Sequence, residues 1–174
     1  MLEHKLRPMT KADLGQVLGW RNSPEVRRYM YTNHEIEPQE HRAWFGASIA
    51  DPLISLLIYE HHGEASGFVN ITRDRCLQVA SWGFYLSPSA QKGTGRSLGN
   101  QALSFAFDEL SLHKLNGRAL GFNNRSIKFH KDMGFVEEGC LRDQHFDGSV
   151  YHDVICFGLL DYEWHAIDKE RRNE

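Results

Sequence analysis

The chain has 174 residues, a formal charge of −3 and a pI near 6.4, with 41% hydrophobic and 25% charged residues. These values are typical of a water-soluble globular protein, and the acidic balance argues against general nucleic-acid binding. No apolar run approaches the roughly 18 residues of a membrane span, and the N-terminus lacks the apolar centre of a signal peptide, so we expect a cytoplasmic protein that binds no membrane.

The N-terminal third predicts a short strand followed by three helices. Residues 2–8, with Leu2 on one face, form the strand, and Thr10 with Asp13 forms a capping box before the first helix. Pro24 begins a short second helix, and Pro38 begins a third that runs to about residue 50. We assign the buried side of this third helix to Trp44, Phe45, Ala47, Ser48 and Ile49.

Three strands are expected next. Residues 53–60 and 64–72 read as a hairpin around His61-His62-Gly63, and residues 76–86 as a long strand. The three cysteines, Cys76, Cys140 and Cys156, have no zinc-site spacing. We therefore expect buried thiols and no bound metal.

A glycine-rich loop follows the long strand and leads into a helix over residues 94–110. Such a turn suits phosphate, because unpaired backbone N–H groups and the positive helix end point to one spot. Gly93 and Gly95 begin neither a P-loop, which needs Gly-x4-Gly-Lys-Ser/Thr, nor a dinucleotide fingerprint, which would need glycine where Leu98 stands. A turn that needs glycines only for its shape remains the simpler alternative.

The C-terminal half predicts a strand over 113–120, a helix over 126–133 and a final hairpin over 135–162. Asn123 would cap the helix, Gly134 would end it, and Asp147-Gly148 would form the hairpin turn. Strand hairpins and crossover helices together indicate an α/β fold. We expect a single domain over residues 1–164 and a solvated tail over 165–174.

The order of elements over residues 5–164 resembles the GCN5-related N-acetyltransferase (GNAT) superfamily. Residues 90–95 match its Gln/Arg-x-x-Gly-x-Gly/Ala loop at both glycines and depart from it at Ala90. Residues 123–142 resemble the ribosomal-protein N-acetyltransferase branch, whereas 20–41 and 82–86 are similar to amino-sugar acetyltransferases of pseudaminic acid synthesis. The resemblance implies a mixed, mostly antiparallel central sheet flanked by helices on both faces.

This resemblance implies an acetyl-CoA-dependent N-acetyltransferase whose glycine-rich loop holds the coenzyme diphosphate. Main-chain groups of the strand end and of the loop would make most of the contacts, and Asn123 would hold the pantetheine arm. The implied coenzyme contacts are Phe84, Tyr85, Leu86, Lys92, Gly93, Thr94, Gly95, Arg96, Ser97, Asn123 and Ser126.

Two catalytic roles follow from the resemblance. The oxyanion that forms on the thioester needs a hydrogen-bond donor, which we assign to a backbone N–H at the strand end, at Leu86. Many relatives use a tyrosine to protonate the departing thiolate, and His130 stands at that position here. An imidazolium can protonate a thiolate, whose ordinary pKa is about 8.5.

The resemblance also implies an acceptor: the 4-amine of a UDP-linked 4-amino-4,6-dideoxy sugar, which attacks acetyl-CoA directly in a ternary complex. The implied acceptor contacts are Arg21, Met30, His41 and Asn70, with Lys5 and Arg28 as further candidate phosphate partners. No single base stands out, and His34, His41 or Glu35 acting through water are candidates. A homodimer through sheet-edge pairing is compatible with such a sheet.

Three other interpretations remain open: a protein N-terminal acetyltransferase of the ribosomal type, a polyamine acetyltransferase, and a non-catalytic CoA-binding module. The second-half motifs fit the first two equally well. Residues 20–41 distinguish them, because their arginines and histidines suit an anionic acceptor, whereas a polyamine site should be acidic.

Overall fold

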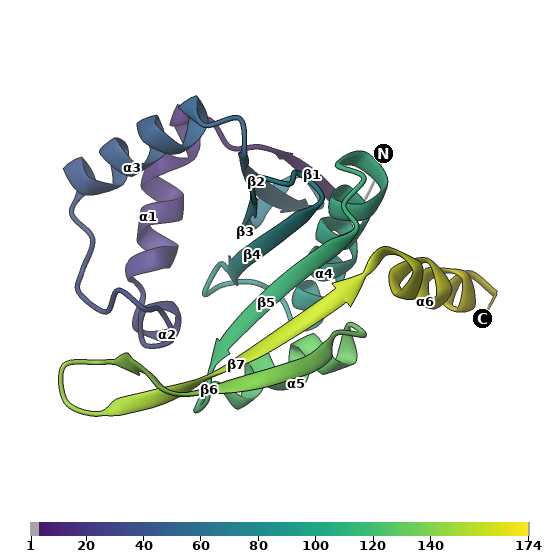
Figure 1. The fold of residues 1–174 in the computed structure, drawn as a ribbon. Helices are drawn as coiled ribbons and strands as arrows, with labels where there is room; N and C mark the ends of the chain where they lie inside the picture. The colour runs from purple at the N-terminus through teal and green to yellow at the C-terminus, as the bar shows by residue number, and fades with distance from the viewer. Residues whose placement is uncertain (1–3, 174) are drawn as a thin grey trace. The chain divides into compact units, whose positions relative to one another are not determined.

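The computed structural model describes residues 4–173; Leu2, expected on the first strand, lies outside them. The strands are β1 (His4–Pro8), β2 (Ile54–His61), β3 (Glu64–Arg73), β4 (Val79–Leu86), β5 (Lys114–Leu120), β6 (Val136–Phe146) and β7 (Tyr151–Leu160). The helices are η1 (Lys11–Asp13), α1 (Leu14–Asn22), α2 (Pro24–Arg27), α3 (Pro38–Ala50), α4 (Thr94–Ser104), η2 (Phe105–Glu109), α5 (Asn124–Asp132) and α6 (Asp161–Asn173) (Figure 1). This order confirms the predicted α/β class.

The strands form one sheet in the order β1-β2-β3-β4-β5-β7-β6. The pairs β1–β2, β2–β3, β5–β7 and β6–β7 are antiparallel, whereas β4 pairs with β5 in parallel over Val79–Ser81. The described chain divides into two compact units, the first comprising residues 4–72 and 82–102 and the second residues 73–81 and 103–173.

The first unit has its core between α1, α3 and one face of β2 and β3. Val17, Phe45, Ile58 and Phe68 are buried together there, and α1 lies beside α3 (Figure 1). Leu57 and Val69, whose side chains alternate with these along the strands, are also buried. On that opposite face, the Cδ1 atom of Leu98 in α4 lies 2.5 Å from the position of a Cβ on Gly67. Helices therefore cover both faces of the sheet within this unit.

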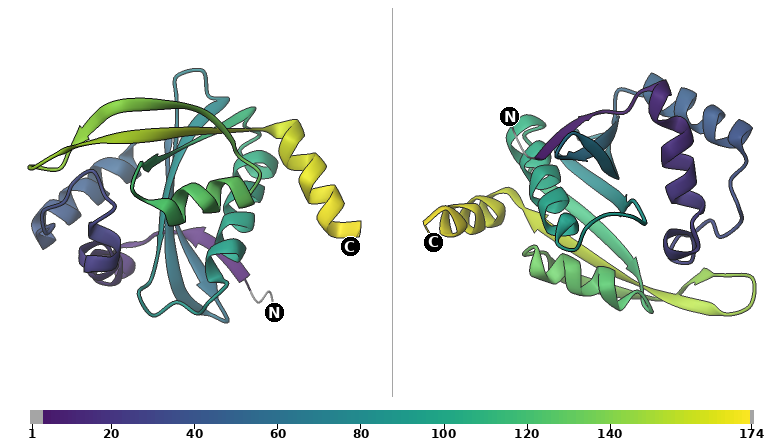
Figure 2. Two further views of the ribbon diagram at one scale, coloured as in Figure 1. Left: turned by 90° about the horizontal axis from the view of Figure 1, so that it is seen from below. Right: turned by 180° about the vertical axis from the view of Figure 1, so that it is seen from behind.

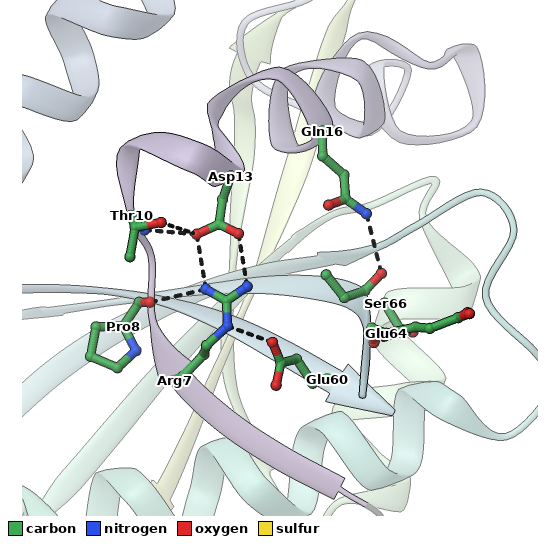
Figure 3. Close-up of polar contacts among 9 residues, drawn as sticks. Arg7, Pro8, Thr10, Asp13, Gln16, Glu60, Glu64 and Ser66 are labelled. Atoms are coloured by element: carbon green, nitrogen blue, oxygen red, sulfur yellow. Dashed lines mark hydrogen bonds and ion pairs between the residues drawn. The ribbon is translucent and has the colours of Figure 1, made fainter. Parts of the chain in front are cut away.

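An ion-pair network joins β1 to the start of α1 (Figure 3). The Arg7 guanidinium donates to both carboxylate oxygens of Asp13, at 2.9 and 2.8 Å, and to Glu60 at 2.5 Å. Asp13 Oδ2 also accepts the backbone N–H of Thr10 at 2.8 Å. The predicted capping box is therefore present, and it is tied to the sheet as well.

In the second unit, α5 packs on β5 and β6, and α6 follows directly from the end of β7 (Figure 2). The N–H of Ser126 donates to Asn123 Oδ1 at 3.1 Å, and Gly134 follows the helix with φ = +98°. Both predicted ends of α5 are therefore confirmed. Within residues 4–173 no helix is long and apolar enough to cross a membrane.

Several predicted details differ from the structure. The strand expected over 76–86 begins only at Val79, because residues 74–77 turn and Leu77 adopts φ = +65°. Cys76 and Cys140 are exposed and Cys156 is half-buried, so the prediction of buried thiols was wrong. The tail expected over 165–174 is helical up to Asn173, where α6 ends, and its solvation stays a prediction.

Candidate active site

The predicted coenzyme loop lies in the first unit, between β4 and α4. Gly93 has φ = +96°, a conformation that side chains with a Cβ rarely adopt. The N–H of Thr94 donates to Gln91 O at 3.2 Å, and the N–H of Arg96 donates to Gly93 O at 3.0 Å. The turn itself therefore uses two of the N–H groups that the sequence analysis assigned to the diphosphate.

The side chain of Thr94 provides a different sign of a ligand in this loop. Thr94 is buried, and its Oγ1 has no hydrogen-bond partner among residues 4–173. A buried polar group left unpaired costs roughly 1–3 kcal/mol, and a helix N-terminus favours anions. The loop therefore fits the diphosphate of CoA, while the individual roles of residues 92–97 stay predictions.

The strand end at Phe84–Leu86 presents its side chains to two faces. Phe84 packs on Trp82, with ring centroids 4.6 Å apart. Tyr85 points to the face of α1 and α3, where its ring lies 5.1 Å from that of Phe68. These are packing contacts, so the coenzyme roles of this segment, including the oxyanion role of Leu86, remain predictions about its main chain.

His130, the predicted general acid, is buried in the second unit. Its ring stacks on Phe157 with centroids 4.8 Å apart, and its Nδ1 lies 2.8 Å from the carbonyl oxygen of Ser126. Burial lowers the pKa of His130, and the bond to Ser126 opposes this shift only in part. The neutral imidazole is therefore the favoured form at pH 7. Only the protonated minority of the protein could then act as the predicted general acid.

Arg21 is the central charged side chain of the predicted acceptor site. It stands at the end of α1, and its Nη2 donates to Thr32 O at 2.8 Å. Its Nη1 is buried and has no partner among the described residues. Asn22 exchanges two 2.9 Å hydrogen bonds with the backbone of Ile36, so the end of α1 also fixes the loop before α3.

His41 and Tyr85 share the electrostatic environment of Arg21. His41 is 5% exposed, and burial first, then the Arg21 charge, lowers its pKa. Burial raises the pKa of Tyr85, which Arg21 opposes. At neutral pH this part of the first unit therefore holds one guanidinium, a neutral imidazole and a neutral phenol.

Trp44 is a candidate contact that the sequence analysis missed, because it was assigned to the core. Its indole is 37% exposed and stacks on His41, with ring centroids 5.0 Å apart. The buried stripe of α3 is instead His41, Phe45 and Ser48, and Ile49 is 54% exposed. The spacing of His41, Phe45 and Ser48 is the sequence signal that could have placed Trp44 at the edge of the buried stripe of α3.

Asn70 lies on the same sheet face as Phe68, two residues along β3. A Cβ on Gly83 would lie 2.6 Å from Asn70 Oδ1, so the glycine makes room for this amide. Met30 lies in the turn after α2, where its N–H donates to Arg27 O at 3.0 Å. Gly83 thus leaves space for the Asn70 amide on the sheet face of Phe68. The acceptor roles of Asn70 and Met30 stay predictions.

The remaining charged candidates of the first unit are differently placed. Glu35 lies 3.6 Å from Arg27, and His34 lies 3.2 Å from Glu40. The guanidinium of Arg28 lies over the Tyr29 ring at 4.6 Å, and Lys5 is exposed on β1. Among residues 4–173, no group of three His, Cys, Asp or Glu side chains could hold a metal ion.

Comparison with known proteins identifies the family. The profile of the acetyltransferase (GNAT) domain matches residues 4–136. The chain belongs to the GNAT acetyltransferases. Two relatives of this acetyltransferase are the spermidine N(1)-acetyltransferase of Vibrio cholerae, 36% identical over 162 residues (91% of this chain, 94% of the relative), and acetyltransferase PseH of Campylobacter jejuni, 25% identical over 156 residues (88% and 90%).

A solved structure confirms the fold of this acetyltransferase. Spermidine N-acetyltransferase from Vibrio cholerae, in complex with CoA and spermine, matches with a TM-score of 0.86 over 94% of this chain and 98% of that one, at 24% identity. The enzyme is an acetyl-CoA-dependent N-acetyltransferase with a mixed α/β fold and a mostly antiparallel sheet. Of these two relatives, one is named for spermidine and the name of the other specifies no acceptor, so family membership alone leaves the acceptor open.

Proposed function

We propose that the acceptor is an amine on a UDP-linked 4-amino-4,6-dideoxy sugar, acetylated by direct attack on acetyl-CoA in a ternary complex. The observation that carries this proposal is the buried Nη1 of Arg21, which has no partner among residues 4–173. A guanidinium offers its N–H groups in a planar fork that matches phosphate oxygens. An anionic acceptor would satisfy this donor, whereas a cationic one would be repelled by it.

Two carboxylates in the segment of the predicted acceptor residues, Glu35 and Glu40, already have partners within the chain, which disfavours a polyamine acceptor. Glu35 is close to Arg27, and Glu40 is close to His34. A polyamine carries several ammonium groups and is best held by carboxylates that have no cation of their own. Glu35 therefore already has Arg27 as a counter-ion, and Glu40 already contacts the ring of His34.

The half-exposed indole of Trp44 supports a nucleotide on the acceptor. Its stacking on His41 fixes one face of an aromatic platform in the same unit as Arg21. Stacking of a base on an aromatic side chain is worth about 1–3 kcal/mol. Trp44 would hold the uracil ring, while Arg21 would bind the diphosphate.

The reaction then needs three further contributions from the chain. The acceptor nitrogen attacks the thioester carbon, and the backbone N–H at Leu86 would donate to the oxyanion. When the C–S bond breaks, the thiolate takes a proton, for which His130 is the predicted source. The loop at Gly93 would hold the diphosphate of the coenzyme throughout.

A polyamine acceptor is the second candidate. The Vibrio cholerae relative, which is 36% identical, is named for spermidine. Acceptor contacts decide between these candidates, and in this chain Arg21, His41 and Trp44 favour the nucleotide. Peptide N-termini, suggested by the resemblance to ribosomal-protein acetyltransferases, are the third acceptor class to compare.

Release of CoA thiol tests the proposal, with a UDP-4-amino-4,6-dideoxy sugar, spermidine and an N-terminal peptide as acceptors. We expect the highest kcat/KM with the nucleotide sugar. Arg21→Gln should raise the KM for that sugar about 10- to 100-fold, because it removes hydrogen bonds to a charged group, and should leave the KM for acetyl-CoA unchanged. Exposed Arg42→Gln on α3 is the matched control.

Preferential turnover of spermidine by the wild type would contradict the proposal. An Arg21→Gln variant with an unchanged KM for the nucleotide sugar would remove Arg21 from the site. Arg21→Lys keeps the positive charge but removes the planar fork of N–H donors. We expect its affinity for the nucleotide sugar to lie between those of Arg21→Gln and the wild type.

A further inference from the structure

A cavity of about 430 Å³ opens in the second unit beside the first residues of β7. It is lined by Gly121, Phe122, Tyr151, His152, Asp153 and Ile155. Phe122 directly precedes Asn123, the N-cap of α5 and a predicted contact of the pantetheine arm. The cavity therefore begins one residue from a predicted coenzyme contact.

One side chain of this cavity, His152, forms a dyad with a carboxylate. The Nε2 atom of His152 lies 2.6 Å from Asp147 Oδ2. Asp147 is held in place by the backbone N–H groups of Ser149 and Val150, which donate to its Oδ1 at 2.8 and 2.9 Å. These bonds, with that of Val150 contributing most, hold the pKa of Asp147 at about 2, so the carboxylate is ionised at neutral pH.

This geometry fixes the tautomer of His152. A carboxylate only accepts hydrogen bonds, so Nε2 must carry the proton and Nδ1 is the acceptor nitrogen of the neutral ring. No hydrogen bond to Nδ1 is present within residues 4–173. The ring meets Phe122 edge-on at 4.6 Å and stacks on His145 at 6.4 Å. The dyad is thus an oriented proton acceptor at the wall of a cavity.

Acetyl transfer to an amine requires such a group. At neutral pH the acceptor is largely an ammonium ion, and its nitrogen has no lone pair until a proton leaves. We propose that His152, oriented by Asp147, is the general base that receives this proton. The proposal rests on the N-acetyltransferase activity and applies to any amine acceptor, whether or not it carries a nucleotide.

The proton balance of the step is as follows. An N–H bond of the ammonium breaks, and an Nδ1–H bond forms on His152, whose positive charge faces the Asp147 carboxylate. The freed lone pair forms the C–N bond, the C–S bond breaks, and the thiolate takes the proton predicted to come from His130. The second ammonium proton, lost as the amide forms, restores the proton of His130, and His152 keeps the first one. The imidazolium then releases its proton to solvent, so one ammonium and one thioester give one amide, one thiol and one proton.

The other candidate bases are less suited. Glu35 and His34 lie close to charged partners, and His41 is almost fully buried beside Arg21. Asp153, which also lines the cavity, accepts the backbone N–H of Asp143 at 2.9 Å. The titratable groups around His152 are Asp147 in the hairpin turn, His145 on β6, and Tyr151 and Asp153 on β7.

The pH dependence of kcat/KM tests the proposal, with whichever of the UDP-amino sugar and spermidine the enzyme acetylates. We expect His152→Gln to lower kcat/KM about 100-fold at pH 7 and to remove one inflection on the acidic side of the profile. Asp147→Asn should lower kcat/KM less, since it disturbs only the orientation of the ring. The control is His165→Gln, exposed on α6 and outside the cavity lining, and it should keep the wild-type profile.

Chemical rescue separates a base from a structural residue. In His152→Ala, imidazole added to the buffer should restore activity in proportion to its concentration, because the cavity can hold it. A merely structural histidine would show no such rescue. Unchanged profiles in the His152 variants, or loss of the same inflection in His41→Gln instead, would overturn the proposal.

The imidazole ¹⁵N spectrum gives a readout that needs no acceptor. Wild-type protein at pH 8 should show His152 as the Nε2–H tautomer, assigned by its loss in His152→Gln. An Nδ1–H tautomer would overturn the proposal even if no acceptor were turned over. With the Nε2–H tautomer and imidazole rescue together, the base role stands.

Discussion

At the scale of single residues, His130 shows how burial changes a prediction. The sequence placed a histidine where many relatives have tyrosine. Nδ1 must donate to the Ser126 carbonyl, because a carbonyl only accepts, so Nε2 of the neutral ring carries no proton. Donation to a thiolate from Nε2 therefore needs the imidazolium, which burial disfavours.

The lowered pKa of His130 predicts how stability depends on pH. The unfolded chain binds this proton near pH 6.5, whereas the folded protein binds it only at lower pH. The folded state is therefore favoured above about pH 6.5 and loses stability as the pH falls below it. We expect the free energy of unfolding, measured in urea, to decrease from pH 7.5 to 5.5, and less steeply in His130→Phe, which keeps an aromatic ring on Phe157.

The same variant tests the acid role. If His130 protonates the thiolate, the ratio of wild-type to His130→Phe kcat should increase as the pH falls, because the acceptor's own titration cancels in the ratio. A ratio independent of pH would remove His130 from proton transfer and leave it a packing residue.

At the scale of elements, the junction of β1 and η1 depends on Asp13. This carboxylate is held by Arg7 and by the N–H of Thr10, at a turn that sets the entry of α1 (Figure 3). Arg7 is the main cause that lowers the pKa of Asp13, to about 2. The junction positions α1, and hence Arg21 at its end.

We expect Asp13→Asn to lower the free energy of unfolding by about 2 kcal/mol at pH 7, because it weakens hydrogen bonds to a charged group. The contribution of Asp13 is complete above about pH 4 and is lost as the pH falls through about 2, so the difference from wild type should shrink in acid. Urea unfolding at pH 7 and pH 3 measures it. Exposed Glu64→Gln is the control, and equal losses in both variants would contradict this account.

At the scale of the whole molecule, acetyl-CoA should stabilise the folded protein. A ligand at 100 times its Kd adds about 2.7 kcal/mol, which is roughly 5–10 °C in Tm for a chain of this size. The prediction is that Gly93→Ala loses most of this shift. The control Gly63→Ala, at φ = +83° with open space around it, should keep the full shift. Thermal unfolding with and without acetyl-CoA gives both values.

Both substitutions put a Cβ on a residue with positive φ, so each should lower the Tm of the free protein through a strain of about 1–2 kcal/mol. Only Gly93 belongs to the predicted diphosphate loop. If Gly93→Ala and the parent respond equally to acetyl-CoA, the coenzyme role of this loop is wrong.

Much of the fold could be predicted because its signals are local. Pro24 and Pro38 begin helices, Asn123 and Gly134 bound α5, and His62-Gly63 form a turn with positive φ at both residues. The strand expected over 76–86 was too long by three residues, because Leu77 turns where its apolar side chain predicted a strand. An apolar residue in a turn gives the same pattern as one in a strand.

The candidate site was predictable in its residue types and less so in its environments. Arg21 and His41 were identified by resemblance, but the unpaired Nη1 and the burial of His41 depend on packing around α1 and α3. Trp44 was assigned to the core although its indole is half-exposed. The dyad of His152 and Asp147 could not be predicted from the sequence, because two ordinary hairpin residues become an oriented pair only when the turn folds.

The sequence by itself determined the order of elements, because caps, turns and strand alternation depend on neighbours a few residues apart. Its resemblance to the GNAT acetyltransferases implied the sheet arrangement and the acetyl-CoA-dependent chemistry. Tertiary structure alone decided which polar groups are buried without partners, which aromatic rings remain exposed and where a cavity opens. These properties arise from side chains that the fold brings together, and they set the charge state of His41 and His130 and the orientation of the His152 ring.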